Sequence, residues 1–163
     1  MPVIAHIENA SGVEEIPDAT TMRGWITAAL PPNCDNDLEL SVRIVDIDEM
    51  TELNYQYRHK NKPTNVLSFP AELPDGIDLP LLGDIAICAP VVEQEAREQG
   101  KTSAAHWAHM LVHGTLHLRG YDHIDEAEAD EMEALETTIM TGLGFPPPYD
   151  PTATESANTG ERP

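Results

Sequence analysis

One stretch constrains this chain more than any other: His113-Gly-Thr-Leu-His117-Leu-Arg-Gly-Tyr-Asp-His123. Five of the seven histidines lie between residues 106 and 123, so the clustering is local. On an α-helix, positions i and i+4 differ by about 40° in azimuth and about 6 Å in height. The imidazoles of His113 and His117 can therefore point at one ion roughly 2.0–2.1 Å away. The spacing predicts a helix with two metal ligands on one face.

A third ligand has to return to the same point. A continuous helix would carry residue 123 to about 240° from His117, facing away. Gly120 can adopt the left-handed conformation that ends a helix, and the next two residues then deliver His123. The spacing HxxxHxxGxxH is that of a metzincin-type zinc site, and three neutral histidines leave one position open for water. We predict one Zn²⁺ per chain, bound by His113, His117 and His123.

Other residues of the same helix narrow the chemistry. His106 and His109 share the face of the predicted ligands and are expected to pack or to contact a ligand rather than to bind the ion. Zinc peptidases carry a glutamate general base directly after the first histidine, but here that residue is Gly114. This difference disfavours peptide hydrolysis, and we expect the glycine to open space beside the ion for a bulky substrate. Asp122 is the one acidic residue within the motif and could act as a base or as a turn residue.

A second candidate site is basic, although the formal net charge of the chain is −20. Such a charge opposes non-specific binding to nucleic acids or anionic membranes. Arg58, Lys60 and Lys62 nevertheless fall within five positions, and they account for three of the nine Lys and Arg residues. An arginine can hold two phosphate oxygens through its planar fork. We predict that Arg58 binds the substrate phosphate, with Lys60 and Lys62 beside it, although a solvated loop would also explain the lysines. Asp84 could hydrogen-bond a metal-binding histidine or serve in a turn.

Hydrophobic periodicity predicts an α+β domain with one small mixed β-sheet and helices packed against it. Strands are expected at 2–8, 38–47, 66–69 and 82–88, and helices at 18–30, 48–58, 90–99, 104–118 and 125–142. We expect Asp48, Ser103 and Gly100 to cap helices. Residues 1–145 are predicted to form a single domain, and residues 146–163 a disordered C-terminal tail that is rich in Pro, Thr and Ser.

The two cysteines form no CxxC pair, and no N-terminal segment is apolar enough for a signal peptide or a membrane span. A cytoplasmic protein with no membrane partner is expected. Cys88 is predicted to be a small core residue.

The histidine motif, together with Pro63-Thr-Asn-Val-Leu-Ser-Phe-Pro70 and Gly83-Asp-Ile85, closely resembles the YbeY family of bacterial endoribonucleases over about residues 38–145. The resemblance implies a zincin-like fold and a zinc-dependent endonuclease for single-stranded RNA, active in ribosomal RNA maturation and ribosome quality control. It also implies ligands at His113, His117 and His123 and a functional arginine at Arg58.

The resemblance further implies ribosomal RNA as substrate, with the small ribosomal subunit or an assembly factor as partner. Two alternatives remain open at this point: a metallohydrolase of another small substrate, and a zinc-stabilised ribosome-assembly module without catalytic turnover.

Overall fold

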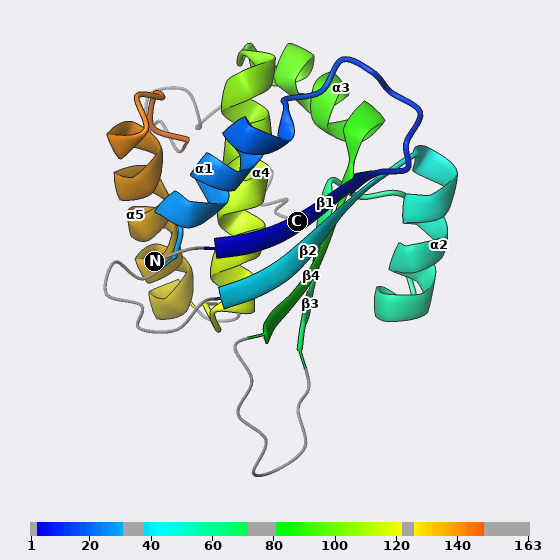
Figure 1. Ribbon diagram of the computed structural model, residues 1–163, viewed down its shortest axis with the longest axis horizontal. Helices are drawn as coiled ribbons and strands as arrows, with labels where there is room; N and C mark the ends of the chain where they lie inside the picture. Colours follow the sequence, from blue (N-terminus) through cyan, green and yellow to red (C-terminus); the bar gives the residue numbers. More distant parts are fainter. Residues whose placement is uncertain (1–2, 31–37, 72–80, 122–125, 149–163) are drawn as a thin grey trace, which may run out of the picture.

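The computed structural model describes residues 3–30, 38–71, 81–121 and 126–148. Its elements are β1 (Val3–Asn9), α1 (Ala19–Ala28), β2 (Leu38–Val45), α2 (Ile47–Arg58), β3 (Val66–Pro70), β4 (Leu81–Cys88), α3 (Ala89–Gln99), α4 (Ser103–Leu118) and α5 (Glu126–Gly142). Figure 1 shows them as one twisted sheet with helices on both sides. Each predicted strand and helix is present in these residues, which confirms the α+β fold class.

The sheet is mixed and has the strand order β1-β2-β4-β3. Strands β1, β2 and β4 are parallel, whereas β3 pairs with β4 in antiparallel orientation. In the register of β3, Ser68 lies opposite Ile85 and Phe69 lies opposite Asp84. Successive side chains of a strand point to opposite faces, so β3 presents Ser68 to one layer of helices and Phe69 to the other.

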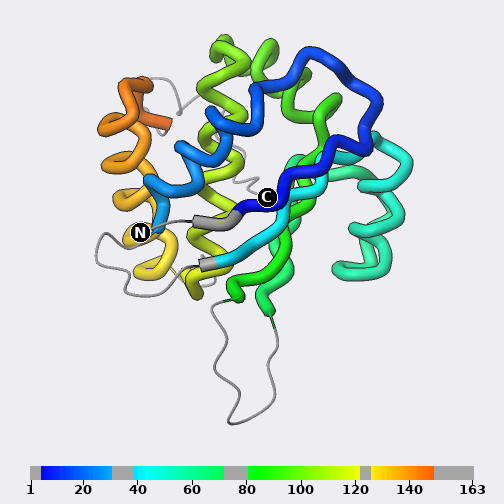
Figure 2. Tube along the Cα trace, in the orientation of Figure 1, coloured from blue at the N-terminus to red at the C-terminus, as the bar shows by residue number. Residues whose placement is uncertain are grey.

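The two faces of the sheet are covered unequally. Helices α1, α4 and α5 cover one face and enclose the main core, whereas α2 lies on the other side (Figures 1 and 2). Helix α4 runs through the main core, where Trp107, Leu111 and Leu116 are fully buried. A smaller cluster under α2 includes Met50, Leu67 and Cys88, with Phe69 packed against it. The predicted core position of Cys88 is confirmed.

Two of the predicted helix caps are wrong by one or two residues. The side chain of Asp46, not Asp48, caps α2 by accepting a hydrogen bond from the backbone N–H of Glu49. Thr102, not Ser103, caps α4 in the same way. In both cases the capping residue has an extended backbone, which the first helical residue cannot adopt. Gly100 ends α3 at φ 69°, as predicted.

The C-terminal tail and the domain boundary at 145 stay predictions. Residues 149–163, which make up most of the tail expected from 146, lie outside the described part of the chain. Among the described residues, no helix is long and apolar enough to cross a bilayer.

Candidate metal centre

Helix α4 ends just before Gly120, as predicted from the sequence. Gly120 has φ 103° and its N–H donates to the carbonyl of His117, while the N–H of Tyr121 donates to the carbonyl of Leu116. This pair of bonds satisfies carbonyls that the helix end would otherwise leave open, and it reverses the chain after His117. The third predicted ligand, His123, and the candidate base, Asp122, lie outside the described residues.

The two histidines that the structure describes do converge. The Nε2 atoms of His113 and His117 are 3.0 Å apart, and the ring centroids are 4.5 Å apart. Each ring is held through its other nitrogen. Nδ1 of His113 donates to Oε2 of Glu136 at 2.5 Å, and Nδ1 of His117 donates to the carbonyl of Tyr121 at 3.0 Å.

These partners determine which nitrogen carries the hydrogen. Carbonyl and carboxylate oxygens only accept hydrogen bonds, so both Nδ1 atoms must be the donors. In the neutral imidazoles, the lone pairs of both Nε2 atoms then face one another across 3.0 Å. Two lone pairs this close repel each other unless a proton or a metal cation lies between them. This donor set fits a metal ion that prefers neutral imidazole ligands, such as zinc.

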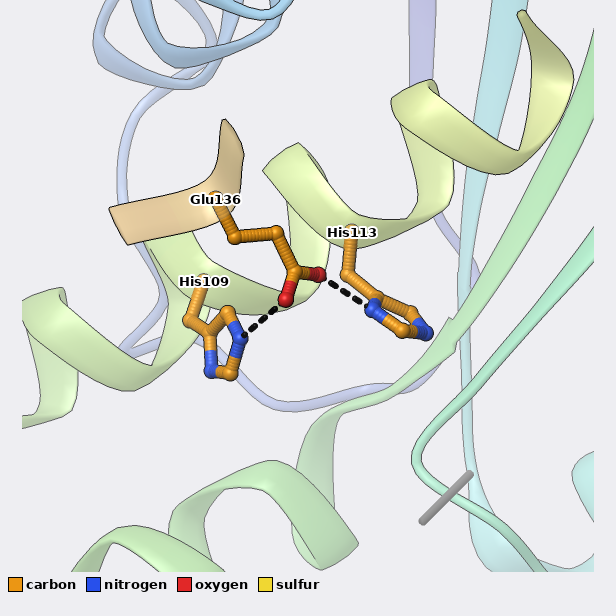
Figure 3. A group of neighbouring side chains, drawn as sticks. All are labelled: His109, His113 and Glu136. Atoms are coloured by element: carbon orange, nitrogen blue, oxygen red, sulfur yellow. Dashed lines mark hydrogen bonds and ion pairs between the residues drawn. The ribbon is translucent and has the colours of Figure 1, made fainter. Parts of the chain in front are cut away.

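Glu136 is the residue that sequence analysis missed. It projects from α5 into the core with no exposed surface, and its Oε1 lies 3.6 Å from Nε2 of His109 (Figure 3). Burial by itself raises the pKa of this carboxyl, but the imidazoles of His109 and His113 outweigh burial and hold the pKa well below its usual value. Glu136 is therefore ionised. Burial lowers the pKa of His109 to about 4, so that ring is neutral near pH 7.

The three residues in Figure 3 could themselves hold a metal ion. One donor atom from each of His109, His113 and Glu136 lies within 4.8 Å of the others, and all three residues are buried. His113 belongs both to this group and to the predicted pair with His117. Its Nδ1 faces Glu136 and its Nε2 faces His117. With Nδ1 acting as a donor, Nε2 is the ring nitrogen of His113 that offers a lone pair to an ion, which favours a supporting role for Glu136.

The sequence does carry a signal for Glu136. Met132, Glu136 and Met140 follow a spacing of four, and all three are buried. A carboxylate within such an apolar stripe needs a partner, because burying an unpaired charge is very costly. Asp84, the acidic residue that the sequence offers for this role, points to the other face of the sheet, where it accepts a hydrogen bond from Ser41. Asp84 therefore does not face His113, and any contact with His123 lies outside the described residues.

Gly114 serves packing instead of opening space beside an ion. A Cβ atom at this position would lie 3.3 Å from the side chains of Ile85 and Ser68. The hydroxyl of Ser68 donates to the carbonyl of Gly114 at 3.1 Å. The glycine lets α4 lie directly against β3 and β4, and the expectation of free space is corrected.

The basic residues lie at the end of α2. Arg58 is its last residue, and His59 follows in the left-handed conformation at φ 60°. The side chain of buried Asn54 donates to the carbonyl of Lys62 at 2.8 Å, which ties the loop back to the helix. The side chains of Arg58, Lys60 and Lys62 are all exposed. The loop is thus held through its backbone while its cations face solvent.

The profile of the family described as "Endoribonuclease YbeY" matches residues 6–144. The chain belongs to the YbeY family. Membership in the YbeY family implies an endoribonuclease, and hence a hydrolase, that acts in ribosomal RNA processing. The solution structure of TM1509 from Thermotoga maritima has the same fold, with a TM-score of 0.52 and 23% sequence identity over 98% of this chain and 100% of that chain.

Proposed function

We propose that this YbeY-family protein is a metal-dependent endoribonuclease that hydrolyses phosphodiesters of single-stranded RNA in ribosomal RNA maturation and ribosome quality control. The observation that carries the proposal is the convergence of the His113 and His117 Nε2 atoms, 3.0 Å apart, with an acceptor behind each ring. His123 would supply the third ligand, and the expected ion is a single Zn²⁺. The chain would work in the cytoplasm.

In this proposal the histidines hold the ion, and the basic side chains bind the RNA. When bound, such an ion supplies a Lewis acid for a phosphoryl oxygen and makes water more acidic. His113 and His117 bind through Nε2 because Glu136 and the carbonyl of Tyr121 occupy their Nδ1 hydrogens. Arg58 meets the negative charge that grows on the phosphate in the transition state. Lys60 and Lys62 attract the neighbouring phosphates.

The charge of the whole chain bears on how RNA arrives. A formal net charge of −20 repels a polyanion at long range, and the exposed cations at the end of α2 act only locally. We therefore expect weak binding of free RNA. The small ribosomal subunit or an assembly factor would then deliver the RNA segment to be cut.

The test is cleavage of precursor ribosomal RNA by protein purified free of other nucleases. Zinc-loaded protein should cut with multiple turnovers, a chelator should stop the reaction, and added zinc should restore it. A His117→Ala protein purified in parallel controls for contaminating nucleases. If zinc binds but each protein molecule cleaves at most once or not at all, the protein is an assembly module instead of an enzyme.

A further inference from the structure

We infer that Tyr57 and Phe69 form a stacking site for one unpaired nucleobase beside the phosphate that Arg58 is proposed to bind. The inference deepens the proposed function and rests on RNA being the substrate. Tyr57 lies in the last turn of α2, and its ring centroid is 4.5 Å from that of Phe69, with the ring planes at 64°. The two rings come from different elements, so their contact depends on the tertiary fold.

The pair is both rigid and open to solvent. Phe69 packs against the small core cluster under α2, which fixes its ring from behind. Tyr57 makes the edge contact with Phe69 and is still 51% exposed. A fixed and exposed ring is a suitable platform for a base, because every nucleobase has a π face and stacking tolerates any sequence.

The position of the pair places it beside the proposed phosphate ligand. Arg58, the proposed phosphate ligand, directly follows Tyr57 in the chain. Phe69 directly follows Ser68, whose hydroxyl donates to the carbonyl of Gly114, the residue after His113. Phe69 itself points to the opposite face of β3 from Ser68, so the aromatic pair lies on the α2 side of the sheet, beside Arg58. A base can stack here only when it is out of a duplex, which explains a preference for single-stranded RNA.

Helix α2 provides a matched control. Tyr55 is 56% exposed, nearly the same as Tyr57, and belongs to the same helix. Two residues correspond to about 200° of rotation, so Tyr55 points away from the side that faces Phe69. A general effect of losing an exposed tyrosine would appear equally at both positions. A stacking site would appear at Tyr57 alone.

The experiment measures binding and cleavage of a short single-stranded RNA by the zinc-loaded full chain. Tyr57→Ala should weaken binding by about 5- to 100-fold, the range for losing one stacked base. Tyr57→Phe should bind like the parent, and so should Tyr55→Ala. Zinc content and the thermal midpoint are measured for every variant. Tyr57→Leu keeps an apolar contact with Phe69 without a π face, so weak binding by a stable Leu variant separates stacking from folding.

An abasic RNA series locates the base. Removing one base at a time should weaken binding to the parent at one position, and Tyr57→Ala should lose nothing further there. Parent protein that cleaves RNA while Tyr57→Ala and Tyr57→Leu bind as tightly as Tyr55→Ala overturns the stacking site and leaves the nuclease proposal intact. Parent protein that neither binds nor cleaves any RNA overturns both.

Discussion

The interface of α4 with α5 and the end of α2 are built in opposite ways. In the first region His113, His109 and Glu136 are buried, and each makes specific polar contacts inside the protein. In the second region Arg58, Lys60 and Lys62 point into solvent, and only the backbone of their loop is tied down through Asn54.

This difference matches the two tasks of the metal-dependent nuclease proposed above. A metal ligand has to be held in one orientation and one tautomer, which requires fixed partners in the interior. A group that binds a long, flexible substrate has to be reachable from solvent. Changes in the interior should therefore act through the metal and through stability. Substitutions at the end of α2 should alter RNA binding or cleavage and leave zinc content and stability unchanged.

The largest expected effect is that of His117→Ala. It removes one of the two converging Nε2 atoms, and we expect loss of both zinc binding and RNA cleavage. Elemental analysis after dialysis and a cleavage assay measure the two losses. His6→Ala is the matched control, since His6 is an exposed histidine on β1. A His117→Ala protein that keeps one zinc per chain would remove this residue from the metal centre.

Arg58→Ala should lower the cleavage rate by about 10²–10³, the usual cost of losing one preorganised donor to transition-state charge. Zinc content and stability should not change, because the side chain lies outside the core. Arg58→Lys should recover only part of the rate, since an ammonium group cannot grip two oxygens as a guanidinium does. Rates are compared at saturating RNA.

Arg97→Ala is the control for Arg58. Arg97 is also an exposed arginine in the last turn of its helix, in this case α3. Equal rates for the parent and both alanine variants would show that Arg58 is only a solvated surface residue. Loss of zinc together with activity in Arg58→Ala would show that the exposed region is not independent of the interior.

Glu136→Gln tests the interior without touching a proposed ligand. A glutamine can present its amide group to His113, and then it no longer selects the Nδ1–H tautomer. We expect zinc affinity to fall by about 10- to 100-fold, the typical cost of losing a carboxylate behind a metal-binding histidine. Competition with a chelating dye measures it. Glu131→Gln, exposed on the same helix, should bind zinc like the parent, and equal affinities for the two variants would contradict the supporting role.

Helix periodicity and glycine placement predicted the end of α4 and its pair of histidines. They did not predict which side chains of other elements contact these histidines. The i, i+4 histidines and Gly120 fix the end of α4 through neighbours in the chain, so the sequence suffices there. Glu136 and Asp84 are both acidic residues in elements with apolar patterns. Which of them meets His113 depends on the face of the sheet that α4 covers, and periodicity does not encode that choice. Asn54 was missed for a different reason: its partner is a backbone carbonyl in the loop that follows α2, and side-chain patterns do not reveal such a bond.

A smaller effect is expected at Glu95, which also meets a buried histidine but belongs to no candidate metal group among the described residues. Its Oε1 lies 2.8 Å from Nε2 of buried His106, and Asn65 donates to it at 3.0 Å. Burial by itself raises the pKa of Glu95, but hydrogen bonds from His106 and Asn65 outweigh it and lower the pKa. Glu95→Gln should therefore reduce stability near pH 7 and leave zinc affinity unchanged.

The pH dependence of this loss of stability follows from the direction of the Glu95 pKa shift. A carboxyl whose pKa is lower in the folded protein stabilises it above the ordinary value of 4.5, and this stability is lost as pH falls through the folded pKa. Urea unfolding gives the free energy of unfolding of Glu95→Gln and of the parent. The difference between these two free energies should shrink as pH falls below 4.5. A constant difference from pH 7 to pH 3 would contradict an ionised Glu95. Weakened zinc binding would show that any buried acid–histidine pair affects the metal.

The smallest effect should come from truncation after residue 148, and the reason lies in Phe145. Its ring packs edge-on against Trp25 at a centroid distance of 6.0 Å, so the apolar contacts of α5 continue to this residue. The family match ends at residue 144, close to the same place. Removing residues 149–163 should leave zinc content, cleavage rate and thermal midpoint nearly unchanged.

Phe145→Ala in the truncated chain should lower the free energy of unfolding by roughly 1–2 kcal/mol, as expected for a partly buried aromatic ring. Urea unfolding of the truncated chain with and without Phe145→Ala measures this difference in stability. If the truncation alone costs as much as Phe145→Ala, the removed segment contributes to the fold or to one of the two regions.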